Sequence, residues 1–416
     1  MGGLGYISAS DLRRSAWAAS WAATWGRIKE LVPALAGVAP SSSPTPSLVE
    51  LREALAVIKA THDGVAADHE ALDATLVHVD SQGDKHFQFH PGDLPKSDEL
   101  VSIDDVAEGA QEPRMLKAQR ALTAGIHHRR WLDLANDARL HSRRAAAHFL
   151  SVSQPHAGAF LSAIPSSPDM RLSSDEFALI LQRRLALPVS AQSNLTYSPS
   201  LRRPIDPLAD SLQNDHEHGC RHNKVLRKWV NVLKSAFGAA AVRMEPKASA
   251  VYSPGVIPDC VAFKAKDGKH HRLFELKISS PLSAGEAGTA EIGGRAAFGN
   301  TESQHKSDVL GRPASGDDPA TLGAYSGALT RGHSVTPIIH ESFGGFAPDA
   351  CKLLDECVKK HGKRFGSDSE VATWATRNFR AMCAQRISVA LHLACAAEIL
   401  GNIERDVALV NKQAEA

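Results

Sequence analysis

The stretch VIPDCVAFKAKDGKHHRLFELKI, residues 256–278, decides the fold. Two apolar runs flank a polar connection that contains glycine, a pattern that predicts two antiparallel strands joined by a turn. Asp259 lies in the first run, and Glu275 and Lys277 lie in the second. Because side chains alternate along a strand, Glu275 and Lys277 share one face, and a hairpin partner can bring Asp259 to it. The hairpin therefore predicts two carboxylates and one amine on a single face of a sheet.

These three side chains suit the hydrolysis of a phosphodiester. That reaction needs a divalent cation to neutralise developing charge and to lower the pKa of the attacking water. We expect Asp259 and Glu275 to hold Mg²⁺ or Mn²⁺, and Lys277 to orient the water or stabilise the charged oxygens. Glu245, in the sequence MEP, is a candidate third acid. This is the PD-(D/E)xK pattern of a metal-dependent endonuclease that forms no covalent intermediate.

A structural interpretation of the same residues stays open. Asp259 could cap the end of a strand, while Glu275 and Lys277 form an exposed hairpin face. The context favours the catalytic interpretation, because both motifs interrupt apolar strand-like runs and a basic helix precedes them. That helix, RHNKVLRKWVNVLKSAF at residues 221–237, contains no acid. We expect four basic side chains of this helix to contact DNA phosphates without sequence preference: Arg221, Lys224, Arg227 and Lys228.

The chain predicts an α/β fold with mainly helical N-terminal and C-terminal regions, and a resemblance to PD-(D/E)xK nucleases implies a restriction-endonuclease-like mixed central sheet flanked by helices. Its 416 residues, 43% of them hydrophobic, exceed one ordinary core. The sheet strands are expected at 256–263, 272–279 and 335–341. The expected regions are a helical N-terminal region (1–79), a polar loop or insertion (80–113), a helical region and connection (114–215), the nuclease-like domain (216–346) and C-terminal helices (347–416).

Several helices can be placed from local signals. SSDEF at 173–177 has the residues of a capped helix start. The stretch 48–60 predicts a short helix after a Pro/Ser-rich linker, and the arginine-rich stretch 127–150 a long one. The charged face of that long helix could follow phosphates or simply be solvated. Trp17, Trp21 and Trp25 recur every four residues, and core packing is favoured for them over base stacking.

Charge and cysteine content suggest an intracellular protein. The formal net charge of +1 means that nucleic-acid binding must rest on locally basic elements. The six cysteines lack closely spaced pairs, and Arg13 and Arg14 stand where a secretory signal needs an apolar run. The most apolar stretch, residues 387–400, is shorter than the roughly 20 residues that span a bilayer. We expect it to be a buried helix and expect no membrane association.

Longer blocks of sequence carry a resemblance. They are MGGLGYISASDL (1–12), HAGAFLSAIPSSPDMRLSSDEFALILQRRLALP (156–188), RHNKVLR (221–227), EP (245–246), PDCVAF (258–263), FELK (274–277), AFGNTE (297–302) and GHSVTPIIHESFGGF (332–346). With these blocks the chain resembles the C-terminal region of retrotransposon-type reverse-transcriptase polyproteins, which end in a restriction-like endonuclease. The likeness covers most of the chain.

The resemblance implies a central mixed sheet flanked by helices and an activity that nicks target DNA to prime copying of the element. DNA is the implied substrate, element RNA a second partner, and the nucleus a destination. Asp259, Glu275 and Lys277 match the family's catalytic positions. Lys306 and Tyr325 are candidate matches to a later lysine and tyrosine of the family, with no role assigned.

The chain departs from that family at the zinc knuckle that commonly precedes the RHN helix. Here the only donors are His216, His218, Cys220 and His222. Structural zinc usually takes two separated ligand pairs, so a solvated histidine-rich loop is expected rather than a zinc site.

No polymerase is expected in this chain. The Asp-Asp pairs at 104–105 and 317–318 each have serine, not an aromatic residue, two positions earlier. The sequence therefore predicts a fragment or relic of a larger element. Two rivals to the nuclease stay open: a catalytically inactive nucleic-acid-binding remnant, and a helical scaffold whose α/β insert has no site.

Overall fold

The computed structural model divides the chain into two compact units, essentially residues 3–140 and 141–416. In the second unit it describes residues 141–189, 194–213, 218–246, 256–265, 267–282, 305–312, 320–365 and 378–415. In the first it describes only short helical pieces between residues 49 and 138. The predictions for Trp17, Trp21, Trp25 and the loop at 80–113 lie outside the described residues.

The two helices predicted near the N-terminus are helical wherever they are described. These residues fall between 49 and 61 and between 126 and 138. The long helix predicted at 127–150 is interrupted at Ser142, whose backbone is extended and whose hydroxyl accepts the N–H of Ala145 at 3.0 Å. Because serine satisfies a free N–H best at a helix start, a new helix, α5 (Arg143–Val152), begins there.

A four-stranded mixed sheet forms the centre of the second unit. Its order is β3 (Val242–Met244), β4 (Cys260–Ala262), β5 (Arg272–Ser279) and β8 (Ser334–Glu341). The first three strands are antiparallel to their neighbours, whereas β5 and β8 run parallel, from Arg272 beside Ser334 to Ser279 beside Glu341. The predicted strand at 272–279 is confirmed and that at 335–341 begins one residue earlier, while only three residues of the run at 256–263 pair as a strand. The class is therefore mixed α/β, as predicted.

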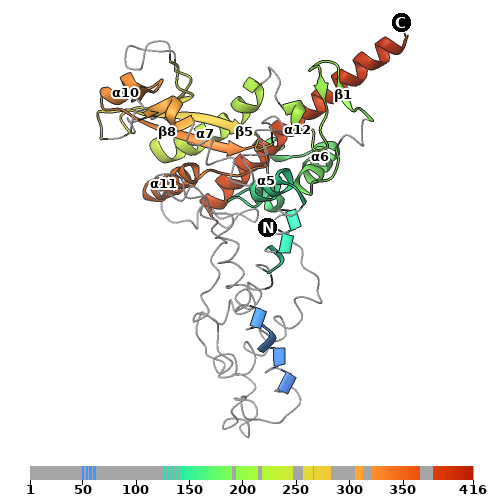
Figure 1. Ribbon diagram of the computed structural model, residues 1–416. Coiled ribbons are helices and arrows are strands. Elements are labelled where there is room, and N and C mark those ends of the chain that lie inside the picture. The colour runs from blue at the N-terminus through green and yellow to red at the C-terminus, as the bar shows by residue number, and fades with distance from the viewer. Residues whose placement is uncertain are drawn as a thin grey trace. The chain divides into compact units, whose positions relative to one another are not determined.

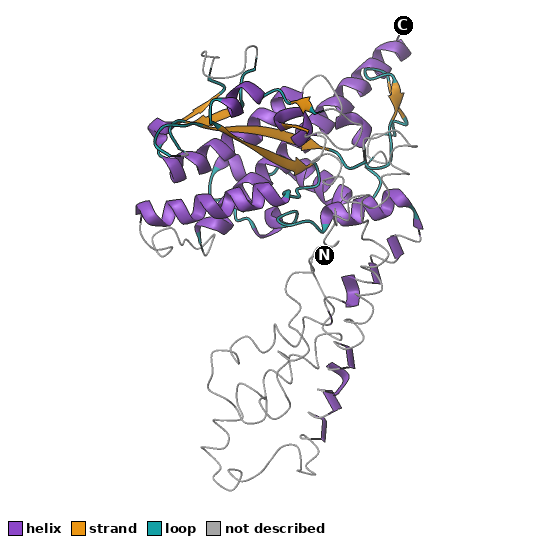
Figure 2. Cartoon of the chain, turned by 60° about the vertical axis from the view of Figure 1, so that its left-hand side comes forward, coloured by secondary structure: helices purple, strands orange, loops and turns teal. Residues whose placement is uncertain are grey.

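One face of the sheet carries most of the apolar core (Figures 1 and 2). It is covered by α7 (His218–Phe237), α11 (Pro348–Phe365) and α12 (Phe379–Glu415). The strands contribute Phe274, Leu276 and Ile338, and α7 contributes Trp229, all of them buried. The predicted basic helix thus starts three residues early and packs through its apolar stripe.

The opposite face has a smaller apolar cluster. Val261 and Leu273 from the strands pack there with Val309, Tyr325 and Ala328. Tyr325 precedes α10 (Ser326–Thr330), and Ala328 lies within it. Because strand residues alternate, Glu275 and Lys277 share this face with Leu273, next to the tyrosine.

The remaining elements pack mainly around α12. Ser173 caps α6 (Ser174–Arg184) through a capping box with Glu176, which confirms the helix start predicted from SSDEF. Apolar side chains of α6 and α12 form a second core with η4, η5 and η7. The short elements are η4 (Ala159–Ser162), η5 (Pro168–Met170), η7 (Asp210–Gln213), η8 (Ala239–Ala241), β1 (Tyr197–Ser198), β2 (Arg203–Pro204), β6 (Gly311–Arg312) and β7 (Thr321–Leu322).

Helix α12 joins regions that the sequence divided into separate segments. It contacts α7 beside the sheet and α6 on its other side, so the expected boundaries at 215/216 and 346/347 fall inside one compact unit. The stretch 387–400 lies in its buried part, as expected. By length and composition α12 could span a bilayer, yet 67% of its most apolar window is buried inside the protein.

Candidate active site

The β4–β5 hairpin brings the two predicted acids together. Cys260 pairs with Phe274, so the next position outward sets Asp259 opposite Glu275. Burial, and then the negative charge of nearby Asp259, raise the pKa of Glu275. The two carboxylates are therefore neighbours at the edge of the small apolar cluster.

Asp259 is held by two hydrogen bonds to the same oxygen. The backbone N–H of Leu276 lies 2.6 Å from Asp259 Oδ2, and His222 Nε2 lies 3.0 Å from it. His222 comes from the first turns of α7, so the basic helix is tied to the acidic end of the hairpin. Since both donors use Oδ2, the lone pairs of Oδ1 are left for another partner. The Asp259 side chain is 15% exposed, so such a partner can reach it from solvent.

Glu275 is held by a buried phenol. The hydroxyl of Tyr325 donates to Glu275 Oε2 at 2.5 Å. Burial, and then the charge of Asp259, raise the pKa of Glu275 to about 7, although the hydrogen bonds from Tyr325 and from the backbone of Asp259 oppose this. Burial and the nearby carboxylates raise the pKa of the Tyr325 phenol, so it stays a donor at neutral pH.

The balance of charge at this pair favours a cation. Burial acts to lower the pKa of His222, but its hydrogen bond and charge interaction with Asp259 outweigh this and raise the pKa. Two close carboxylates repel each other when both are ionised, and a divalent cation with oxygen preference relieves that repulsion. The oxygen donors of Asp259 and Glu275 are of the kind that a hard divalent cation prefers.

Lys277 occupies the same strand face and is exposed. It has no hydrogen-bond or ion-pair partner within the described ranges, so its ammonium group faces solvent. Its charge nevertheless reaches into the site, because burial and then Lys277 lower the pKa of His305. An ammonium placed in this way can act on a water or on a phosphate oxygen near the carboxylates.

The four basic residues predicted to meet DNA have different surroundings. Lys224 and Arg227 are exposed, as a phosphate contact requires. Lys228 forms an ion pair with Asp169 of η5. Arg221 departs from the expectation, because it is 6% exposed and lies 3.0 Å from the buried carboxylate of Glu398. Its guanidinium fastens α7 to α12 instead of facing solvent.

The candidate third acid, Glu245, contacts the site through a backbone hydrogen bond and not through its carboxylate. Glu245 is exposed with a φ of 41°, and its N–H donates to the carbonyl oxygen of Asp259 at 2.8 Å. Lys306, a candidate family match, instead pairs with Asp349 of α11 at 2.7 Å. Among the residues that the structure describes, no three His, Cys, Asp or Glu side chains form a metal-binding group. Glu245 is therefore not gathered with Asp259 and Glu275.

Two residues of the site escaped the sequence-based prediction. His222 was placed in the basic helix and in a histidine-rich stretch without a role at the site, and the helix turns its ring toward Asp259. Tyr325 was a family match without a role, and it lies 50 residues beyond its partner Glu275. The sequence carried only weak signals for either, namely the position of His222 beside Asn223 in RHN and the resemblance that singled out Tyr325.

Comparison with known proteins gives no assignment. No protein-family model, no curated protein and no solved structure matches the chain. What is known of this chain therefore comes from its structure, which is a mixed α/β unit with two neighbouring carboxylates at a hairpin.

Proposed function

We propose that residues 141–416 form a metal-dependent DNA endonuclease of the PD-(D/E)xK type, with a restriction-endonuclease-like sheet and a retroelement origin. The observation that carries the proposal is the β4–β5 register, which sets Asp259 opposite Glu275 with Lys277 on the same face. The resemblance to retroelement polyproteins supports the same activity. It also supports DNA as substrate, element RNA as a second partner and a nuclear location.

The residues of the chain divide the work of hydrolysis. Asp259 and Glu275 would hold Mg²⁺ or Mn²⁺, and the bound cation would neutralise developing charge and lower the pKa of the attacking water. Lys277 would orient that water or stabilise the negative charge of the transition state. His222 and Tyr325 hold the two carboxylates by hydrogen bonds and so fix the direction of their remaining lone pairs.

The basic surface of α7 would hold the DNA backbone. Lys224 and Arg227 are exposed on this helix and can meet the DNA backbone. Each phosphate contact adds affinity and salt dependence without sequence preference. Buried Arg221 is not part of this surface.

Nicking of supercoiled plasmid by the full chain tests the proposal. We expect cleavage with Mg²⁺ or Mn²⁺, none with EDTA, and a loss of at least roughly 100-fold in Asp259→Ala and Lys277→Ala. Asp259→Ala should keep its affinity for DNA, because the carboxylate serves the cation and repels phosphate. Glu404→Gln is the matched control, since Glu404 is an exposed acid on α12 far along the chain from the hairpin.

Three outcomes contradict the nuclease. Undiminished metal-dependent cleavage by Asp259→Ala removes the assigned site. A wild-type chain that binds DNA in a salt-sensitive manner but never cuts it is the inactive binding remnant. Salt-insensitive binding to a protein, without DNA binding, identifies a scaffold.

A further inference from the structure

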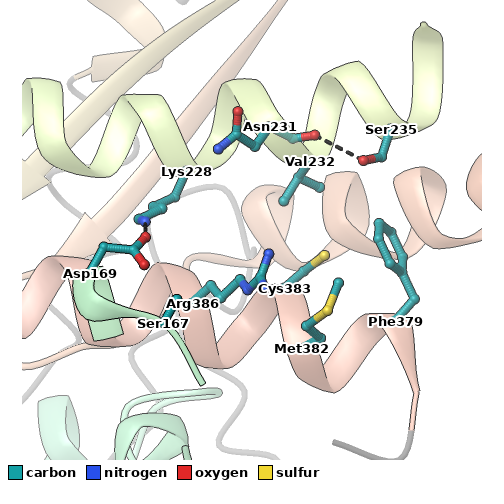
Figure 3. Close-up of a pocket in the computed structure, with 10 residues that line it drawn as sticks. All are labelled: Ser167, Asp169, Lys228, Asn231, Val232, Ser235, Phe379, Met382, Cys383 and Arg386. Atoms are coloured by element: carbon teal, nitrogen blue, oxygen red, sulfur yellow. Dashed lines mark hydrogen bonds and ion pairs between the residues drawn. The ribbon is translucent and has the colours of Figure 1, made fainter. Parts of the chain in front are cut away.

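A second site lies on the other side of the sheet, between α7 and α12. There a cavity of about 280 Å³ is open to solvent, and η5 closes one end of it (Figure 3). Its lining includes none of Asp259, Glu275 and Lys277, although it does include Lys228, one of the four residues predicted to contact DNA. The lining residues are Ser167, Asp169, Lys228, Asn231, Val232, Ser235, Phe379, Met382, Cys383 and Arg386.

Two cations line this cavity. Lys228 reaches down from α7 and forms an ion pair with Asp169, while Arg386 extends from α12 toward α7. Arg386 is exposed and has no hydrogen-bond or ion-pair partner in the described part of the chain. The Asp169 side chain is 56% exposed, so Lys228 can share its ammonium group with an incoming anion. Two cations against one carboxylate leave a net charge of about +1.

The rest of the cavity is divided between apolar and hydrogen-bonding groups. Val232, Phe379 and Cys383 are almost fully buried, and with Met382 they form an apolar wall at the end opposite Asp169. Asn231 is exposed on α7, and its amide offers both donors and an acceptor. The hydroxyl of Ser235 donates to the carbonyl oxygen of Asn231 at 3.1 Å.

These groups match one kind of ligand. A guanidinium with an ammonium group binds a phosphate, because arginine supplies paired donors and lysine a point charge. The apolar wall suits a flat ring, and the asparagine suits the polar edge of a nucleobase. The cavity volume lies near the lower end of the range of small-molecule sites, which suits one nucleotide and not a larger cofactor.

We propose that this cavity binds a single nucleotide, with its phosphate between Lys228 and Arg386 and its base against Met382 and Val232. The nucleotide is either free or the phosphorylated end of a strand, since both carry the same group. This inference does not depend on cleavage at Asp259, because the two sites lie on opposite faces of the sheet.

Calorimetric titration of the full chain tests the proposal. The probes are adenosine 5′-monophosphate, adenosine, inorganic phosphate and a 5′-phosphorylated tetranucleotide of DNA. We expect the monophosphate to bind roughly tenfold more tightly than adenosine or phosphate alone, since only it uses both ends of the cavity. Tighter binding of the tetranucleotide identifies a strand end as the source of the nucleotide, and equal binding identifies the free molecule.

Two variants should move the affinity in opposite directions. Arg386→Gln should weaken binding of the monophosphate about tenfold, because it removes the unpaired cation. Asp169→Asn should strengthen binding about threefold, because it frees Lys228 and removes a repelling charge. Arg243→Gln is the control, since Arg243 is exposed on β3 and lies outside the cavity. Circular dichroism of each variant checks that the fold is kept.

Three results overturn the proposal. They are a monophosphate that fails to bind at millimolar concentration, a monophosphate that binds no better than inorganic phosphate, and an affinity unchanged in Arg386→Gln. Asp259→Ala should bind the monophosphate as the wild type does, whether or not it cuts DNA. Failure of the nuclease and failure of this site are thus separable.

Discussion

The two faces of the central sheet are built for different purposes. The face under α7, α11 and α12 is packed with buried apolar side chains such as Trp229, Phe274 and Ile338. The opposite face has a small apolar cluster next to two carboxylates, one of which has a pKa of about 7. Each strand supplies both faces, because its side chains alternate.

This difference shows that stability and proposed chemistry depend on alternate residues of the same strands. On β5, Phe274 and Leu276 anchor the core, whereas Glu275 and Lys277 face the site. Substitutions on the two faces should therefore separate stability from activity. The following predictions test that separation, from the largest expected effect to the smallest.

Acid should affect the helix-covered side of the sheet first. Burial lowers the pKa of His148 to about 4 and the pKa values of His340 and His392 to about 3. Below about pH 6.5 these histidines bind protons in the unfolded chain but stay neutral in the folded protein. The free energy of unfolding is therefore at its full value above that pH and falls as the pH drops toward 4. Each of these histidines should lower the free energy of unfolding by roughly 2 kcal/mol between pH 7 and pH 5. Urea unfolding at several pH values measures this.

The acid prediction has an internal check. In His340→Asn the number of protons taken up on unfolding near pH 5.5 should fall by about one, because one buried imidazole is gone. His141 is exposed, and its replacement by asparagine should leave the pH slope unchanged. A stability that is flat between pH 7 and 5 would contradict the prediction.

Trp229→Ala should cost about 3–5 kcal/mol of unfolding free energy. The indole is fully buried, and its N–H donates to His340 Nε2 at 2.7 Å, so the variant leaves both a cavity and an unpaired ring nitrogen. Thermal and urea unfolding measure the loss. Leu322→Ala serves as control, because Leu322 is 88% exposed and should change stability by less than about 0.5 kcal/mol. Equal losses in the two variants would refute the assignment of the core.

Tyr325→Phe should reduce nicking about tenfold with a small change in stability. The ring keeps its packing beside Leu273, but Glu275 loses the donor that holds it. A higher concentration of Mg²⁺ should be needed for half the maximal rate. Tyr197→Phe is the control, as Tyr197 is 50% exposed on β1. An unchanged rate and metal requirement would rule out a positioning role for Tyr325.

Arg227→Gln should have the smallest effect. Loss of one exposed cation should weaken DNA binding a few-fold and reduce the slope of log affinity against log salt by about one. Titration of labelled DNA at several salt concentrations measures both. Arg221→Gln should show the opposite profile, with normal salt dependence and lowered stability, because buried Glu398 loses its partner. If the salt slope changed equally in both variants, Arg221 would also have to contact DNA.

Local signals predicted much of the fold. The alternation and turn residues of 256–278 located the hairpin, the serine and glutamate of SSDEF located the start of α6, and the apolar stripe of 221–237 located α7. Such features depend on neighbours in sequence, which a single chain displays. The predicted boundaries at 215/216 and 346/347 lie inside one compact unit, and α12 contributes to the apolar cores on both sides of them.

The candidate site was predictable only where its residues are close in sequence. Asp259, Glu275 and Lys277 belong to one hairpin, so strand alternation alone placed them together. His222 and Tyr325 lie on other elements, 37 and 50 residues from the carboxylates they bind. Arg221 and Arg227 look alike in the sequence, but the packing of α7 on α12 buries one and exposes the other.

The sequence by itself determined the strands, the helix starts and the pair of acids, because these follow from periodicity and capping within a few residues. Only the tertiary structure decided which face of each element is covered. That choice fixed the donors to Asp259 and Glu275, the internal pairing of Arg221 and the cavity beside Arg386. The physical reason is that burial and charge environment arise from chain segments far apart in sequence, and they set which polar groups bind each other and which remain for a ligand.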